Sequence, residues 1–502
     1  MRGTLILLAA GLFARILGFA YRVILARELG SQGMGLLSMV QPVIFFAVTL
    51  ATAGLPVAIS KIVAERAAVK PGRVREVLRT SLIFVILTST FFTAVLLFAA
   101  PFVAHTFLID PRSLHPLLSL VPLLAIVALS VVYRGYFQGL QNMTPGALAQ
   151  GVEQVIRLGL ILWLLPLFLR HGVTEGAVGA GLALVGGELS GLAVLFGCYL
   201  ATSRSTSGPP VEEASFSTET LGEIMAISGP VTLTRIVASV TDLADAVIIP
   251  RRLVVAGFTT DAATAFYGNL YGMAMPLLFF PTVFTFALAQ SLVPAVSEAM
   301  ARGDVALVRR RTDQAIRLGI LVALPTSAIF LLLGHSLGIL FYGKAAVGDL
   351  IIPLSLAAPF LYLEVTASAV LRGLGRAALA TVNGLVGSVV RLGVVYTLAA
   401  DPRIGIAAVI VGVSIDLGLS FLLNLRSLVR IVGLRVDLAG WCLKPALAAL
   451  PLVLLLKPVQ SALLGAGHGL WFATASSLVI GLGAFLLSAF LVGMPLNPRS
   501  IA

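Results

Sequence analysis

Long apolar runs separated by short polar segments occupy most of this chain of 502 residues. A helix needs about 20 mainly apolar residues to cross the hydrocarbon core of a bilayer. Runs of about that length lie at 4–26, 34–59, 81–104, 115–138, 146–169, 176–201, 222–249, 263–290, 316–342, 348–371, 378–399, 404–424, 440–456 and 469–492. The pattern predicts an all-α polytopic membrane protein with about 14 transmembrane helices.

Composition supports a membrane protein rather than a nucleic-acid-binding one. The chain is 59% hydrophobic and 11% charged, and its mean hydropathy of +1.04 excludes an ordinary soluble protein. Its net charge of +12 comes from basic residues in short loops, so no nucleic-acid partner is expected. The heaviest basic clusters, 61–79 and 302–317, become cytoplasmic if both termini are cytoplasmic, as the positive-inside rule requires. Residues 4–26 show no cleavable signal peptide, and we expect them to stay as the first helix.

Sequence matches recur at a fixed interval along the chain. Pro56 in LPVAISK and Pro294 in LVPAVSE are 238 residues apart, and so are Arg134 in YRGYFQG and Arg372 in LRGLGRA. The chain therefore contains two similar halves. Because each half has the same even number of spans, the halves should be parallel, and repeated halves are typical of transporters.

The repeat predicts the domain organisation. An N-terminal lobe of six spans covers 1–203, and a cytoplasmic, acidic, Ser/Pro-rich linker covers 204–221. A C-terminal lobe of six spans covers 222–430, and two further spans lie in 431–502.

Five arginines fall inside the apolar runs. Placing an arginine at the centre of a membrane helix costs about 2.5–3.5 kcal/mol, so such residues line a wet cavity or pair with a carboxylate. A guanidinium also grips phosphate through paired N–H donors. We therefore predict a substrate anion bound within the membrane by Arg15, Arg22, Arg157, Arg235 and Arg391.

Helical spacing places two of these arginines on one surface of the first span. Arg15 and Arg22 are seven residues apart and share a helix face. Arg22 could line the cavity, or it could extend to the interface beside Arg27. In the repeat, VIRLGLIL at Arg157 matches VVRLGVVY at Arg391, and Arg15 has a counterpart in Arg235.

Carboxylates near these arginines leave two interpretations open. Glu153 lies four residues before Arg157, so the two could neutralise each other or share a substrate role. Asp242 and Asp245 follow Arg235 and could carry a coupling proton or cation, or pair with neighbouring arginines. The same alternatives, coupling or a satisfied interhelical bond, apply to the single carboxylates Glu188, Glu364 and Asp416.

No Ser/His/Asp set, metal-ligand spacing or Walker loop stands out, which predicts a protein that is not an enzyme and needs no metal or cofactor. Transport would be driven by membrane potential, H⁺ or Na⁺, or by consumption of the substrate elsewhere. Cys198 and Cys442 lie in apolar stretches and are expected to be small buried residues. Gly187 and Gly191 have the spacing of a tight helix contact.

Four separated stretches resemble one known group of transporters. They are ARILGFAYRVILARELG, GLPVAISKIVAE, YRGYFQGLQNMTPGALAQGVEQVIRL and GMAMPLLFFPTVFTFALAQSLVPAVSEA. They resemble the multidrug/oligosaccharidyl-lipid/polysaccharide (MOP) exporter superfamily, in its stage V sporulation protein B branch, close to the MurJ-type lipid II flippases. In the MurJ-type motif SRVLGFxRD, Arg15 matches the first arginine. Tyr21 stands at the second, with Arg22 one residue later.

The resemblance implies a V-shaped fold of two six-helix lobes with two further helices. It implies a bacterial plasma-membrane flippase for undecaprenyl-pyrophosphate-linked sugar, most specifically the peptidoglycan precursor lipid II. The partners would be the lipid-linked oligosaccharide, the bilayer and cell-wall synthesis proteins, with a role in peptidoglycan or polysaccharide synthesis and in sporulation. The alternative is an ion-coupled drug or small-molecule antiporter of the same superfamily. A third class is a non-transporting scaffold for cell-wall synthases, which would not explain the intramembrane arginines.

Overall fold

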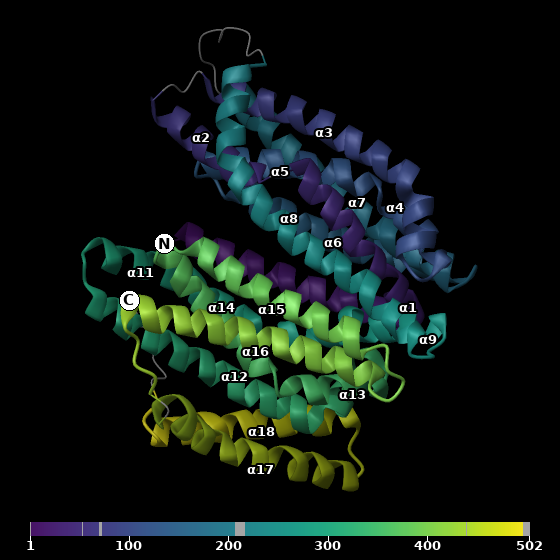
Figure 1. The fold of residues 1–502 in the computed structure, drawn as a ribbon, viewed down its shortest axis with the longest axis vertical. Coiled ribbons are helices and arrows are strands. Elements are labelled where there is room, and N and C mark those ends of the chain that lie inside the picture. The colour runs from purple at the N-terminus through teal and green to yellow at the C-terminus, as the bar shows by residue number, and fades with distance from the viewer. Residues whose placement is uncertain (1, 53, 70–72, 206–215, 438, 495–502) are drawn as a thin grey trace. The chain divides into compact units, whose positions relative to one another are not determined.

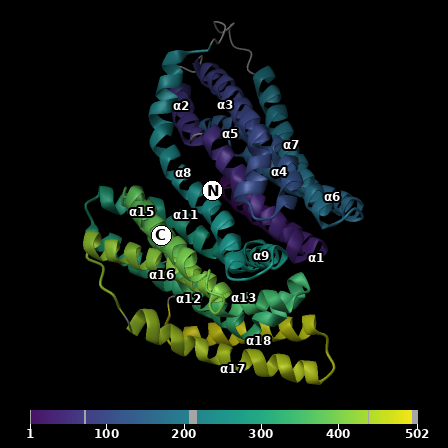
Figure 2. The same ribbon diagram turned by 45° about the vertical axis from the view of Figure 1, so that its right-hand side comes forward.

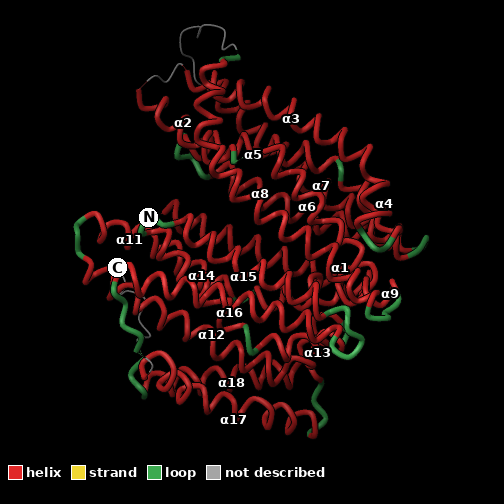
Figure 3. The backbone as a smooth tube through the Cα atoms, in the orientation of Figure 1, coloured by secondary structure: helices red, strands yellow, loops and turns green. Residues whose placement is uncertain are grey.

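The computed structural model describes residues 2–52, 54–69, 73–205, 216–437 and 439–494. Within these residues every regular element is a helix, which confirms the all-α class (Figure 3). Eleven helices are long and apolar enough to cross a membrane, or up to 13 if each of two bent pairs is one span. The protein is therefore a multi-pass membrane protein, and the predicted count of 14 is not confirmed.

Three predicted spans take a different form from the one expected. Helix α1 (Arg2–Thr52) runs through the first two apolar segments and is kinked at Gly30, whose φ of 68° suits a residue without Cβ. The segment predicted as one helix at 263–290 is divided. Pro276 lies in the first turn of one of its pieces, and Pro281 caps the next and has no N–H to continue a helical hydrogen-bond ladder.

The described chain forms two compact units, which we describe separately. The first unit runs to Arg251 and also includes Thr259–Gly268. Its helices are α1, α2 (Leu55–Val69), α3 (Val74–Phe102), α4 (Leu114–Leu120), α5 (Pro122–Gly139), α6 (Thr144–Leu169), α7 (Val173–Ser205), most of α8 (Thr218–Val255) and α9 (Thr260–Tyr267) (Figure 1). Buried side chains of α2, α3 and α5, among them Ile59, Val77 and Val132, form a core cluster of this unit.

The second unit comprises Arg252–Phe258 and the described residues from Asn269 onward. Its helices are α10 (Met275–Phe279), α11 (Thr282–Ala301), α12 (Val305–Tyr342), α13 (Ala345–Ser355), α14 (Ala358–Gly373), α15 (Ala377–Leu398), α16 (Gly405–Val432), α17 (Lys444–Gly465) and α18 (Leu470–Leu491). Its core is built from apolar faces of α11, α12, α14 and α16, with Leu292, Ile316, Val370 and Leu428 buried together.

The boundary between the units differs from the predicted one, because α8 packs with the first unit up to Arg251 rather than opening the second lobe. Ile224 of α8 lies in the core cluster of the first unit. The hydroxyls of Thr49 and Ser239 are 3.1 Å apart. Gly54, with φ 66°, approaches α8 so closely that a Cβ there would lie 2.8 Å from the carbonyl oxygen of Ser228. Of the predicted linker 204–221, the first two residues extend α7, α8 begins at Thr218, and 206–215 lie outside the described residues.

The sequence repeat has a structural counterpart inside each unit. Helix α5 packs on α2, and a Cβ on Gly135 would lie 3.2 Å from the carbonyl oxygen of Pro56. Helix α14 packs on α11, and a Cβ on Gly373 would lie 2.9 Å from the carbonyl oxygen of Val293. Gly135 and Gly373 are also 238 residues apart. A close glycine contact therefore recurs in each unit, although the contacted carbonyl oxygens, of Pro56 and Val293, are 237 residues apart.

Helices α17 and α18 lie side by side in both views and pack against α12 (Figure 2). The Gln460 amide of α17 donates hydrogen bonds to Ser336 Oγ of α12 at 2.9 Å and to Thr474 Oγ1 of α18 at 2.8 Å. One buried amide thus joins three helices. The predicted span 440–456 corresponds to a π-helical turn (Ala439–Leu443) followed by α17, which continues further than expected.

A polar cluster anchors the segment that leads into α17. Arg317 of α12 binds Asp313 at 2.8 Å and Asp437 at 2.6 Å, and the Trp441 indole donates to Asp313 at 2.7 Å. The neighbouring Cys442 is exposed, so the expectation that it is buried was wrong. The reason is that Trp441, not Cys442, occupies the inward position of this turn.

Candidate functional site

The predicted arginines fall into two groups by exposure. Arg15 on α1 and Arg235 on α8 are exposed, and Arg22 on α1 is half-buried. Arg157 on α6 is largely covered, and Arg391 on α15 is only 8% exposed. Burial of a guanidinium is tolerated where a carboxylate neutralises it, and both covered arginines have one.

In the first unit, Glu153 on α6 is the centre of a buried ion network. Its Oε2 accepts a hydrogen bond from Arg134 Nη2 of α5 at 3.1 Å. Its Oε1 accepts one from Arg157 Nη2 at 2.5 Å, which is the i,i+4 pairing that was one of the two alternatives for these residues. Arg157 also donates to Glu188 Oε1 of α7 at 3.2 Å. The network holds two arginines and two glutamates, so three helices are joined with no net charge.

Two glycines make room for this network. A Cβ on Gly187 would lie 2.8 Å from Arg157 Cβ, and one on Gly191 would lie 3.5 Å from Glu153 Oε2. Helix α7 can approach α6 closely at Gly187 because this position lacks a side chain, whereas a Cβ on Gly191 would make an ordinary van der Waals contact. The tight packing predicted for the pair is therefore confirmed at Gly187.

In the second unit, Arg391 pairs with Asp416 of α16 at 3.3 Å. Asp416 also accepts hydrogen bonds from Ser388 Oγ at 3.4 Å and Ser420 Oγ at 3.3 Å. A Cβ on Gly387 would lie 2.5 Å from Asp416 Oδ1, so α15 leaves space there for the carboxylate. Asp416 thus has the interhelical pairing role that was one of its two predicted alternatives.

Each unit pairs its covered arginine with a carboxylate, but the carboxylate lies on a different helix in each. In the first, the carboxylate Glu153 lies four residues before the arginine, and Gly191 faces it from the next helix. In the second, Gly387 lies four residues before Arg391, and the carboxylate comes from Asp416 on the next helix. Glutamate and glycine on one helix pair are replaced by glycine and aspartate on the matching pair.

The remaining predicted carboxylates have different surroundings. Asp242 is exposed on α8, whereas Asp245 is 1% exposed. Glu364 on α14 accepts a hydrogen bond from Asn424 Nδ2 at 3.4 Å, and Asn424 Oδ1 accepts one from Asn383 Nδ2 at 2.9 Å. No group of three or more His, Cys, Asp or Glu residues within the described part of the chain could hold a metal ion.

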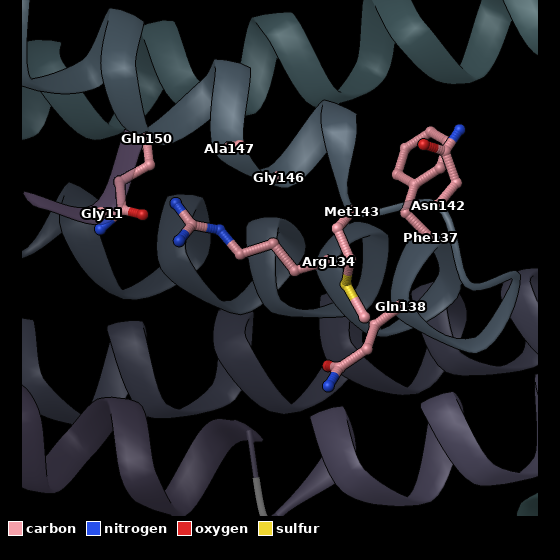
Figure 4. A pocket seen from close by; sticks show the side chains of 9 residues that line it. All are labelled: Gly11, Arg134, Phe137, Gln138, Asn142, Met143, Gly146, Ala147 and Gln150. Carbon is pink, nitrogen blue, oxygen red and sulfur yellow. The ribbon is translucent and has the colours of Figure 1, made fainter. Parts of the chain in front are cut away.

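Arg134, which the sequence repeat matches with Arg372, is not among the residues predicted to bind the substrate. Arg134 lies at the edge of a pocket of about 270 Å³ in the first unit, and its guanidinium and the Gln150 amide extend toward Gly11 (Figure 4). The pocket is lined by Gly11, Arg134, Phe137, Gln138, Asn142, Met143, Gly146, Ala147 and Gln150. The pocket lies at the turn between two spans and exists only in the folded chain, so the sequence could not predict it. The repeat of Arg134 with Arg372 could, however, have marked Arg134 as a candidate binding residue.

Comparisons with known proteins agree with this architecture. A family model for polysaccharide biosynthesis proteins matches residues 1–300, and a MatE model matches residues 270–397. Stage V sporulation protein B of Bacillus subtilis (strain 168) is 36% identical over 448 residues, which cover 88% of this chain and 86% of that protein.

Two solved structures share the fold. The structure of the lipid II flippase MurJ in an inward closed conformation has a TM-score of 0.74 at 13% identity, with 97% of this chain and 98% of that chain covered. A multidrug resistance MATE family transporter of the MOP superfamily, in an inward-facing conformation, has a TM-score of 0.66 at 18% identity and covers 84% and 95% of the two chains.

Proposed function

The chain belongs to the polysaccharide biosynthesis protein family, in the MOP exporter superfamily, and from this premise we propose that it is a lipid-linked oligosaccharide flippase. It would move the headgroup from the cytoplasmic to the outer leaflet of the bacterial plasma membrane by alternating access. The substrate would be an undecaprenyl-pyrophosphate-linked sugar, specifically the peptidoglycan precursor lipid II. Both termini would be cytoplasmic, in line with the basic clusters at 61–79 and 302–317.

The observation that carries the proposal is the exposure of Arg15 and Arg235 within membrane-spanning helices. An exposed guanidinium cannot face hydrocarbon at that depth without a large free-energy cost, so these helix faces must be hydrated. A hydrated surface with arginines suits a pyrophosphate, which accepts paired N–H donors. The polyprenyl tail needs no polar contacts and can stay in the lipid.

The covered arginines have a supporting role in this proposal. Arg157 and Arg391 already bind carboxylates, so they would hold the helix pairs in register rather than bind the headgroup. This narrows the five arginines predicted to bind the substrate to Arg15, Arg235 and the half-buried Arg22.

Translocation requires different affinities for the headgroup in the two access states and no bond making or breaking. We propose that membrane potential, H⁺ or Na⁺ supplies the bias. The candidate coupling carboxylates are Glu364, which accepts a hydrogen bond from Asn424, and Asp242 and Asp245 of α8. Cell-wall synthesis proteins would use the translocated substrate.

The test is translocation of a labelled lipid-linked precursor in vesicles that contain only the purified protein, with the membrane potential set in either direction. Arg15→Ala should abolish translocation, and Arg15→Lys should restore part of it, because an ammonium keeps the charge but loses the planar two-donor geometry. Loss of one charge-assisted contact of about 1.5–3 kcal/mol weakens headgroup binding about ten- to a hundredfold. Arg27→Ala, an exposed arginine of the same helix, is the matched control. A precursor that stays on its original leaflet under both potentials would refute the function.

The second candidate is an ion-coupled antiporter, favoured by the MatE match at 270–397 and by the Glu364–Asn424–Asn383 hydrogen bonds within that unit. It would exchange a proton or sodium ion for a cationic compound. Dye efflux from cells that express the chain, lost in Glu364→Gln, would support it. Precursor translocation by the wild-type protein without any dye efflux from cells that express it would exclude the antiporter.

A further inference from the structure

We infer that the pocket at the α5–α6 turn is a separate binding subsite for a pyrophosphate-linked sugar, within the first unit. The inference rests on the proposed function for the identity of the headgroup. It adds a place where that headgroup is held, apart from the exposed arginines of α1 and α8.

The lining has the chemistry of an anion and sugar site. Arg134 is the one charged side chain among the lining residues, all of which are described. Gln138, Asn142 and Gln150 add three amides. An arginine supplies directed donors to phosphate oxygens, and amides both donate to and accept from hydroxyl groups.

Arg134 is held in place but is not saturated. Its Nη2 binds Glu153 Oε2 at 3.1 Å, and Glu153 is shared with Arg157, which binds it at 2.5 Å. The Nε atom of Arg134 is buried, and no atom of the described residues accepts a hydrogen bond from it. The Arg134 side chain as a whole is 36% exposed, so other donors of the guanidinium can reach a ligand oxygen. Because Glu153 competes for the guanidinium, binding should be moderate, as release of a transported ligand requires.

The backbone around the pocket also favours binding of an anion. Gly146 and Ala147 lie in the first turn of α6, a helix of 26 residues whose N-terminus carries a partial positive charge. The turn before it contains Gln141 with φ 57°, which is unusual for a residue with a side chain. This conformation shapes the turn that presents Asn142 to the pocket.

The size limits what can enter. A volume of about 270 Å³ is slightly below the range of about 300–1,000 Å³ typical of pockets for larger ligands. It has room for the pyrophosphate with one sugar ring and not for a whole oligosaccharide headgroup. A Cβ on Gly146 would meet nothing within 4 Å, so the space is open at this position.

The experiment measures binding to the full-length protein in nanodiscs by titration calorimetry. The probes are inorganic pyrophosphate, UDP-N-acetylglucosamine as a soluble pyrophosphate-linked sugar, and a short-chain polyprenyl-pyrophosphate-linked sugar. Gly146→Leu fills the pocket without altering any charge. Gly159→Leu is the matched control, because Gly159 lies on the same helix, is exposed, and a Cβ there also meets nothing within 4 Å. Arg134→Gln removes the guanidinium.

We expect Gly146→Leu to abolish binding of both sugar-containing probes and Gly159→Leu to leave it unchanged. Arg134→Gln should weaken binding ten- to a hundredfold. Binding of the lipid-linked probe alone would identify a lipid headgroup site, and binding of both would show that the pyrophosphate-sugar is sufficient. Unchanged binding in Gly146→Leu would overturn the inference even if Arg134→Gln failed to fold.

The two proposals can fail separately. If the precursor is not translocated by the wild-type protein but Gly146→Leu still removes sugar binding, the flippase function fails and the subsite stands. If translocation is normal in wild type and in Gly146→Leu, the flippase function stands and the subsite is refuted.

Discussion

The position that Glu153 occupies relative to Arg157 in the first unit can be reproduced next to Arg391 in the second unit. The double variant Gly387→Glu/Asp416→Gly would place a glutamate four residues before Arg391 and a glycine opposite it, as Glu153 and Gly191 are placed around Arg157. If the two helix pairs are equivalent, the new glutamate should replace the aspartate as partner of Arg391. Each single change, in contrast, should be harmful.

The structure sets the magnitudes. Asp416→Gly removes the carboxylate 3.3 Å from an arginine that is only 8% exposed, and breaking a buried pair in this way costs about 3–5 kcal/mol. Gly387→Glu puts a Cβ 2.5 Å from Asp416 Oδ1 and 2.9 Å from the carbonyl oxygen of the same residue, and overpacking costs about 1–3 kcal/mol. Independent effects would add to about 4–8 kcal/mol. In the double variant the pair is restored and the contact with the Asp416 carboxylate is gone, but the contacts with Ser420 Oγ and with the carbonyl oxygen of residue 416 remain, which leaves an overpacking cost of about 1–3 kcal/mol.

The assay is a double-mutant cycle on the free energy of unfolding in mixed micelles, which should give a coupling energy of about 3 kcal/mol or more. Gly387→Gln/Asp416→Gly is the matched control, because it has nearly the same shape without the charge and should stay destabilised. The reasoning would be refuted by additive single effects, or by a glutamine variant as stable as the glutamate variant. Either result would mean that the repeated helix pairs do not place their side chains equivalently.

Two further predictions concern charged residues in each unit. Glu153→Gln weakens contacts to both Arg134 and Arg157 and should lower the free energy of unfolding by about 3–5 kcal/mol. Glu188→Gln leaves Arg157 paired with Glu153 and should lower it by about 1–3 kcal/mol. Equal losses in the two variants would contradict the central position of Glu153 in the network. The backbone N–H of Gly440, and then Arg317, hold the pKa of Asp437 below its usual range. The stabilisation from ionised Asp437 is therefore present at neutral pH and is lost as the pH falls below about 4, through the lowered pKa. The measurement is Trp441 fluorescence in a protein that keeps Trp441 as its one tryptophan, with and without Asp437→Asn. The difference in fluorescence between the two proteins should disappear on acidification. A difference that persists at low pH would show that it does not arise from ionised Asp437.

Local patterns in the sequence determined much of this protein. Apolar runs of span length fixed the all-α membrane fold, because hydrocarbon leaves a spanning segment no better way to satisfy its backbone. The 238-residue interval revealed a repeat, and the structure shows a close helix contact in each unit, at Gly135 and at Gly373. The pairing of Glu153 with Arg157 was readable because residues four apart always lie on one helix face.

The tertiary structure decided which arginines are exposed and which are paired. Nothing local in the sequence joins Arg391 to Asp416, or Arg134 to Glu153, because each pair links different helices. Helix α8 likewise packs with the first unit through Ser228 and Ile224, although the repeat placed it in the second lobe. Periodicity shows which residues share a face of one helix. Periodicity does not show which neighbouring helix that face contacts. The contact depends on the distance between the two helices and on the rotation of each, and these are set by residues distant in sequence, such as Gly187 and Gly387.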